Sequence, residues 1–142
     1  MSPSRNAEGG PAGPTVAEGA PSAAGPSPDA LRELRDAMRQ FAAERAWEPF
    51  HTPKNLAMAL AGEAGELLET FQWLTEEQSR RPAPETLAAA GEEIADVLLY
   101  LVRLGDKLGI DPVAAAHAKL VANARKYPVD KARGNARKYT EL

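Results

Sequence analysis

Two acidic pairs with the same spacing are the first chemically informative feature of the sequence. Glu63 and Glu66 form one pair, and Glu93 and Asp96 form the other. Because residues three apart share one face of an α-helix, each pair would present its carboxylates together. Carboxylates this close raise one another's pKa and are costly to bury without a cation. An all-oxygen ligand set favours a hard ion, so the sequence predicts Mg²⁺, or alternatively Mn²⁺, held against a polyphosphate such as a nucleotide.

A helical wheel places both pairs at the margin of the apolar core. At about 100° per residue, Glu63 falls close to the centre of the apolar stripe of its helix. Glu66 lies further round, beside Trp73. We therefore expect Glu63 and Glu93 to border the core and hold metal most firmly, while Glu66 and Asp96 turn outward toward the substrate.

Other interpretations of the acidic pairs have to be weighed. A single E-x-x-E is usually a solvated helix face, and an inert helical scaffold would carry two of them. A carboxylate di-iron bundle would need Glu-x-x-His on two helices. The histidines are His51 and His117, and neither follows a glutamate by three residues. Since the chain also has no cysteine, iron and thiolate-bound metals are disfavoured. His117, set among alanines, is interpreted as structural.

Aromatic residues lie close to the acidic pairs in the sequence. Trp47, Phe50 and Trp73 could stack a nucleobase, although they could equally be core residues. His51 comes just before a helix start, where it could contact phosphate or ribose or merely cap the helix. Tyr100 follows Asp96 by one turn and could bond a metal ligand or a sugar hydroxyl, or lie at an interface.

Four helical segments must position these residues. Apolar residues recur at three and four positions, and prolines and capping residues mark the boundaries. The predicted helices span 29–47, 53–74, 85–108 and 112–126, with a loop over 75–84. Runs of alternating β-branched residues are absent. The sequence therefore predicts an all-α fold, a bundle of about four helices.

The third predicted helix is apolar more than halfway round. One face carries Ile94, Val97, Leu98, Leu101 and Leu104, while Leu99 and Val102 lie outside that face. A helix this apolar is either central or shared with another subunit. We expect the bundle to be completed by oligomerisation.

Composition separates a tail from the domain. Residues 1–27 are mostly Pro, Gly, Ala and Ser, with too little apolar surface to order themselves, so we expect a disordered tail before a domain at 28–142. No secretory signal and no membrane span are recognisable, which favours a cytoplasmic protein without a membrane partner. The net charge of −3 argues against nucleic-acid binding.

The C-terminal part of the chain is basic. Residues 119–138 contain seven Lys and Arg side chains against Asp130 alone. This segment is either a solvated basic face or an end of the molecule that faces an anion.

Beyond these patterns, the sequence resembles the MazG-like, all-α nucleoside triphosphate pyrophosphatases. That family carries E-x-x-E followed some distance later by E-x-x-D, which stand here as Glu63-Ala-Gly-Glu66 and Glu93-Ile-Ala-Asp96. The likeness is strongest to the dCTP pyrophosphatase branch. It rests on FAAERAWEPFH, KNLAMALAGEAGELLETFQW, EEIADVLLYLV and RKYTEL, and it covers about residues 30–142.

The resemblance implies a role for each matching position. The four acidic residues would bind Mg²⁺, and the base and sugar pocket would be lined by Trp47, Phe50, His51, Trp73 and Tyr100. Phosphate would be met by Lys119, Asn123, Arg125 and Lys126. Family members form dimers or tetramers, which implies a homodimer or homotetramer. One position departs from the pattern, because Met38 stands where the dCTP branch has a pocket histidine, so base recognition is expected to differ.

The implied activity is hydrolysis of a dCTP-like (d)NTP between its α- and β-phosphates, giving a monophosphate and pyrophosphate in nucleotide-pool sanitation or catabolism. Glu63 or Glu66 would accept the proton of the attacking water. The basic C-terminal segment would offset charge on the leaving group. The alternative is a regulatory module that binds Mg²⁺ and nucleotide without catalysis.

Overall fold

The computed structural model of the protein describes residues 29–141, and all of its regular elements are helical. The four long helices are α1 (Ala30–Glu44), α2 (Pro53–Glu69), α4 (Pro84–Leu108) and α5 (Pro112–Lys126), and the short elements are α3 (Glu76–Arg80), α6 (Val129–Ala132) and the 3₁₀ turns η1 (Glu48–Phe50) and η2 (Tyr139–Glu141). The predicted all-α class is confirmed. The predicted tail, residues 1–27, lies outside the described residues.

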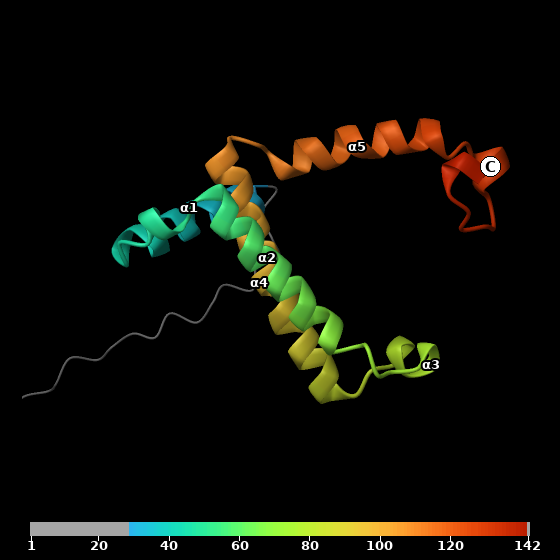
Figure 1. Ribbon diagram of the computed structural model, residues 1–142, viewed down its shortest axis with the longest axis horizontal. Helices are drawn as coiled ribbons and strands as arrows, with labels where there is room; N and C mark the ends of the chain where they lie inside the picture. The colour runs from blue at the N-terminus through green and yellow to red at the C-terminus, as the bar shows by residue number, and fades with distance from the viewer. Residues whose placement is uncertain (1–28, 142) are drawn as a thin grey trace, which may run out of the picture.

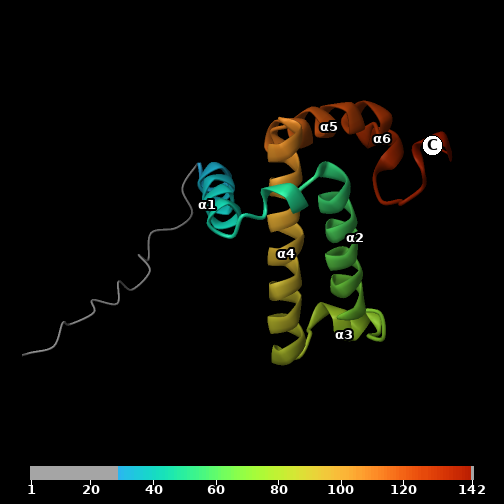
Figure 2. The ribbon, with the colours of Figure 1, turned by 60° about the vertical axis from the view of Figure 1, so that its left-hand side comes forward.

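The helices are arranged around one long pair. α2 and α4 run side by side, and α1 packs against the C-terminal half of α4 (Figures 1 and 2). α3 lies at the opposite end of the pair, where the chain passes from α2 to α4. α5 leaves the C-terminal end of α4 and extends as an arm away from the α2–α4 pair (Figure 1). The groove between α2 and α4 is therefore the place where residues distant in sequence meet.

The predicted helix boundaries at 52–53 and 109–112 are confirmed by their capping geometry. The Thr52 hydroxyl accepts the Asn55 N–H at 3.2 Å, with a proline following as the first helical residue. The Asp111 carboxylate accepts the N–H groups of Val113 and Ala114 at 2.9 and 3.0 Å. Gly109 ends α4 in the left-handed region, with φ 65°, a conformation that costs glycine little.

Two predicted helices are shorter in the structure than expected. α1 ends at Glu44 rather than 47, because Ala46 takes a left-handed φ of 52° and the Trp47 N–H bonds back to the Ala42 carbonyl at 2.9 Å. α2 ends at Glu69 rather than 74, and turns follow it.

The predicted loop over 75–84 is also wrong in part, since it contains α3. The Thr75 hydroxyl accepts the Gln78 N–H at 3.2 Å, and the Gln78 side chain accepts the Thr75 N–H at 2.9 Å. This reciprocal capping box was present in the sequence as Thr-x-x-Gln.

The core of the single chain is small. The buried apolar residues among those described are Ala42, Leu56, Ala90 and Val102. Val102, which the helical wheel placed outside the main apolar face, is thus a core residue. The face itself is largely open, since α4 exposes Leu87, Ile94, Leu98, Leu101 and Leu108. These five positions repeat at intervals of seven, four, three and seven, the spacing of an apolar seam along one helix.

In the described part of the chain, no helix combines the length and the apolar character that crossing a membrane requires.

Candidate metal and nucleotide site

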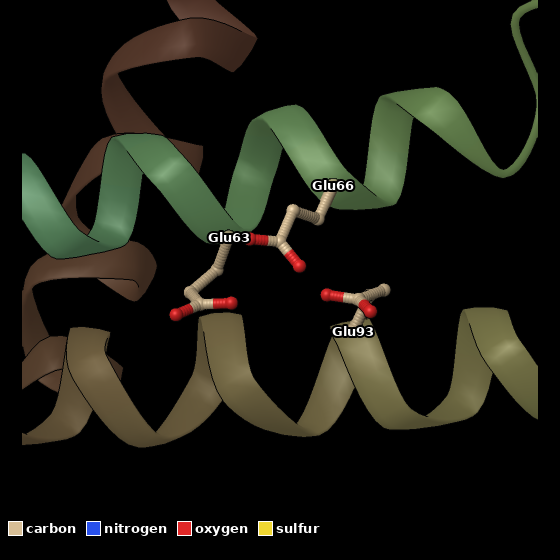
Figure 3. Close-up of side chains that lie close together, drawn as sticks. All are labelled: Glu63, Glu66 and Glu93. Atoms are coloured by element: carbon tan, nitrogen blue, oxygen red, sulfur yellow. The ribbon is translucent and has the colours of Figure 1, made fainter.

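Three glutamates meet between α2 and α4. Glu63 and Glu66 extend from α2 toward α4, and Glu93 extends from α4 toward α2 (Figure 3). One carboxylate oxygen from each lies within 4.8 Å of the others. Because the two helices lie side by side in antiparallel directions, glutamates from two distant i, i+3 pairs meet in one cluster of negative charge.

The electrostatics of this cluster are unfavourable without a cation. Burial raises the pKa of Glu63 and of Glu93, and the neighbouring carboxylates raise both further, Glu66 foremost among them. The Oε2 atom of Glu93 is buried and has no hydrogen-bond partner. A divalent cation would provide that partner and offset the repulsion, so these oxygen donors fit a divalent metal.

Asp96, the fourth acidic residue, stands apart from the three glutamates. It is half-buried on α4 and its charge adds to the raised pKa of Glu63 and Glu93, but its carboxylate does not belong to the cluster. Glu66 is exposed, as the wheel predicts, yet its carboxylate joins those of Glu63 and Glu93. The expected division into an inner and an outer pair therefore does not describe Glu66.

A cleft of about 330 Å³ continues the same groove toward the N-terminal end of α2. It is lined by Trp47, Phe50, His51, Asn55, Leu56, Ala59 and Tyr100. Ala59 precedes Glu63 by one turn of α2, and Tyr100 follows Asp96 by one turn of α4. The cleft and the acidic cluster are thus successive stretches of one groove, a short apolar and aromatic compartment followed by a negative one.

The sequence predicted four of these lining residues, Trp47, Phe50, His51 and Tyr100, and missed Asn55. Its side chain donates to the Phe50 carbonyl at 3.0 Å and so ties η1 to the start of α2. The signal was available, since positions 55, 59 and 63 lie at successive intervals of four along one helix face.

Arg103, which contacts a residue of the cleft, was also not singled out from the sequence. It is 2% exposed on α4 and donates from Nε to Nδ1 of His51 at 3.2 Å. Its placement three residues after Tyr100 is the only sequence signal, because an arginine near a helix end is normally solvated. Burial lowers the pKa of His51, and the charge of Arg103 lowers it further.

Several predicted substrate contacts are not brought to this groove by the single chain. Trp73 is 86% exposed beyond the end of α2 and is not among the residues lining the cleft. Met38 is half-buried on α1, also outside that lining. The predicted phosphate contacts belong to the α5 arm, which extends away from the α2–α4 pair (Figure 1): Lys119, Asn123, Arg125 and Lys126. Lys126 lies over the ring of Tyr139, 5.1 Å from its centroid.

Comparison with known proteins shows which family of proteins the chain resembles. The model of the MazG-like family matches residues 59–142. The dCTP pyrophosphatase 1 of Homo sapiens is 46% identical over 114 residues, which are 79% of this chain and 67% of the relative. The Rattus norvegicus protein of the same name is 46% identical over 126 residues, 84% of this chain and 74% of the relative.

A solved structure supports the same comparison. A pyrophosphatase from Archaeoglobus fulgidus has a TM-score of 0.66 and 42% sequence identity to this chain, and the match covers 69% of this chain and 92% of that one. Sequence and three-dimensional arrangement therefore agree on the same relatives.

Proposed function

Because this chain belongs to the MazG-like family, we propose that it hydrolyses dCTP-like nucleoside triphosphates to the nucleoside monophosphate and pyrophosphate. The observation that carries the proposal is the groove between α2 and α4, where three converging carboxylates lie one helical turn from an aromatic cleft. A role in nucleotide-pool sanitation or catabolism in the cytoplasm is part of the same proposal.

The metal in this proposal is Mg²⁺. Glu63, Glu66 and Glu93 would hold it, with Asp96 as a further ligand from the second acidic pair. When bound, such an ion orients the phosphates and offsets their negative charge. The unpartnered oxygen of Glu93 supports this assignment, since a buried carboxylate oxygen without a donor is otherwise costly.

The residues of the cleft would hold the nucleoside. Trp47 and Phe50 offer aromatic surface on which a base can stack, and Tyr100 offers a hydroxyl to the sugar. Hydrolysis between the α- and β-phosphates requires a water whose proton is accepted during attack. Glu63 would accept it through the carboxylate oxygen that does not bind the metal. The proton then resides on the Glu63 carboxylate.

Other copies of the chain would complete the site. The open apolar seam of α4 supports a homodimer or homotetramer, because a row of exposed leucine and isoleucine side chains gains free energy when covered. In such an assembly the α5 arm of one copy could reach the groove of another and bring Lys119, Asn123, Arg125 and Lys126 to the phosphates. Trp73 could join the cleft of a neighbouring copy in the same way.

The test is pyrophosphate release from dCTP, dUTP, dTTP and a base-modified dCTP in the presence of Mg²⁺. We expect turnover, with the ranking of substrates showing how Met38 affects base choice. Glu63→Gln should lower the rate about 10²-fold or more with helical circular dichroism unchanged, whereas Glu69→Gln, an exposed change on the same helix, should leave the rate near wild type.

Absence of turnover on all four substrates would contradict the proposed enzyme. If calorimetry then showed nucleotide binding with Mg²⁺, the chain would be a regulatory module. If neither binding nor a Mg²⁺-dependent rise in melting temperature were found, it would be a helical scaffold.

A further inference from the structure

Arg103 is the most buried charged side chain among the described residues, and it lies behind the cleft wall. Each of its three nitrogens has a partner from a different residue. Nη1 bonds the Asp106 carboxylate at 2.8 Å, Nη2 bonds Glu48 on η1, and Nε donates to Nδ1 of His51 at 3.2 Å. The last bond connects a buried cation to a residue that lines the cleft.

The chemistry of this bond constrains the histidine. A guanidinium has donors only and does not lose its proton in proteins. Nδ1 must therefore present a lone pair to Arg103. A protonated imidazole, or a neutral one with its hydrogen on Nδ1, would set one N–H against another. The arrangement is compatible with only one form, the neutral ring with its hydrogen on Nε2.

We propose that Arg103 is a positioning residue that fixes His51 as the neutral Nε2–H tautomer, so that the cleft holds a permanent, uncharged hydrogen-bond donor for the nucleoside. The identity of the ligand in this statement rests on the proposed function. Because the ring carries no charge, it suits a neutral acceptor, such as a base carbonyl or a sugar oxygen, better than a phosphate.

The other groups around His51 favour the same form. Among the described residues, Glu48 from η1 is the one acidic side chain whose charge acts on His51, and it is already bonded to Arg103 and Lys107. The two cations, both on α4, oppose a further positive charge, and burial opposes it most, so the pKa of His51 is lowered. Trp47 packs edge-on against the ring, with centroids 6.1 Å apart and an interplanar angle of 66°, which restricts its rotation.

The first test is direct and requires no substrate. Nitrogen-15 NMR of the full chain distinguishes the two neutral tautomers and the charged form of each histidine, and His117→Gln identifies the signals of His51. We expect His51 to be the Nε2–H tautomer at pH 7 and to titrate below the ordinary value of about 6.5. A charged ring or an Nδ1–H tautomer at pH 7 would overturn the proposal, whatever the enzyme assay shows.

The second test removes the arginine. In Arg103→Met, Glu48 keeps Lys107 and Asp106 keeps Arg39 as partners, so neither carboxylate is left alone. We expect His51 to become a mixture of tautomers with a higher pKa, and kcat/KM for the best nucleotide to fall roughly tenfold through KM, with the acidic limb of its pH profile moved to higher pH. Lys107→Met is the matched control, since it removes the other nearby cation but leaves the Nε bond.

A purely structural arginine would lower stability without changing the tautomer or the pH profile, and that result would overturn the proposal. Should Arg103→Met fail to fold, two substitutions of His51 replace it. Gln offers an acceptor and a neutral donor and should keep kcat/KM within about threefold of wild type, while Leu offers neither and should lose roughly tenfold. Equal losses in the two variants would contradict a donor role.

Discussion

The three glutamates of the acidic cluster differ in burial and in the charges around them, although the E-x-x-E and E-x-x-D motifs do not distinguish them. Glu66 is exposed and reaches solvent, whereas Glu63 and Glu93 are half-buried and their pKa is raised. Glu93 carries the additional cost of an oxygen without a donor. The metal-free cluster therefore works against folding at neutral pH, and a bound cation reverses the sign of its contribution.

This reversal gives a prediction for Glu93→Gln. In EDTA at pH 7 the variant should melt roughly 2–4 °C above wild type, because one of the repelling charges is gone. Addition of Mg²⁺ should raise the melting temperature of wild type but not of the variant. Since the folded-state pKa of Glu93 is raised, wild type regains stability as pH falls through that pKa, and the difference between the two proteins should shrink in acid. A variant less stable than wild type in EDTA would contradict the argument.

At the scale of the element, the contact between α1 and α4 is fastened by one carboxylate. Nε of Arg39 on α1 donates to both carboxylate oxygens of Asp106 on α4 at 3.0 Å. Arg103 donates a further hydrogen bond to the same carboxylate at 2.8 Å. Its side chain is 6% exposed, while that of Arg39 is 52% exposed. The hydrogen bond from Arg39, followed by the charges of both arginines, lowers the pKa of Asp106 against the opposing effect of burial.

Asp106→Asn should accordingly destabilise the protein by about 1–3 kcal/mol at neutral pH, because a buried guanidinium loses a charged partner. A lowered folded-state pKa means that this stability is present above the ordinary carboxyl pKa, near 3.8, and is lost as pH falls through the folded value. Urea unfolding at several pH values should show the gap between wild type and variant closing below about pH 4. A gap independent of pH would indicate that lost packing, not charge, is responsible.

The junction of α4 and α5 depends on a glycine. A Cβ added at Gly105 would lie 2.9 Å from the Ile110 carbonyl oxygen and 3.6 Å from the Pro112 ring, so the turn into α5 would have to shift. We expect Gly105→Ala to lower stability by about 1–3 kcal/mol and to weaken activity by redirecting the arm. Gly91→Ala on the same helix has nothing within 4 Å and should be neutral or stabilising by up to about 1 kcal/mol. Equal effects of the two changes on thermal unfolding would refute the steric explanation.

Element boundaries also show which parts of the fold could be predicted from sequence. Thr52, Gly109 and Asp111 carry local capping signals, and the helix limits that they indicated agree with the structure to within a residue. The end of α1 was overestimated, because Ala46 has no intrinsic preference for its left-handed conformation and only its surroundings impose it. The end of α2 was overestimated as well, since turns replace the helix from Thr70 onward. The convergence of Glu63, Glu66 and Glu93 could be predicted only in part. The spacing shows which helix face carries each carboxylate, but not how deeply the carboxylate is buried.

At the scale of the whole molecule, a single chain leaves much of its apolar surface exposed to solvent. Its described core is small, and the α4 seam of Leu87, Ile94, Leu98, Leu101 and Leu108 faces outward. The α5 arm carries basic residues away from the only acidic cluster found in the part of the chain described (Figure 1). The basic residues and the acidic cluster therefore lie on separate parts of each chain. If they are the two halves of the proposed phosphate site, two copies would have to exchange them.

This separation predicts complementation between inactive chains. Glu63→Gln removes the acidic half of a site, and a double change, Lys119→Ala with Asn123→Ala, removes part of the arm. Each protein alone should release little pyrophosphate. Co-expressed with different tags and purified through both, the two chains should form mixed dimers in which one of the two grooves is intact, with about half of wild-type activity.

The control for complementation is Leu98→Glu, which places a charge in the α4 seam. It should keep its helical circular dichroism, elute as a monomer in size-exclusion chromatography with light scattering, and abolish recovery when introduced into both partners. Activity that does not recover in the mixed assemblies, while they remain oligomeric, would mean that the α5 residues do not act on the groove of a neighbour. Because α5 points away from its own groove, the basic arm would then have to be assigned a role apart from the phosphates.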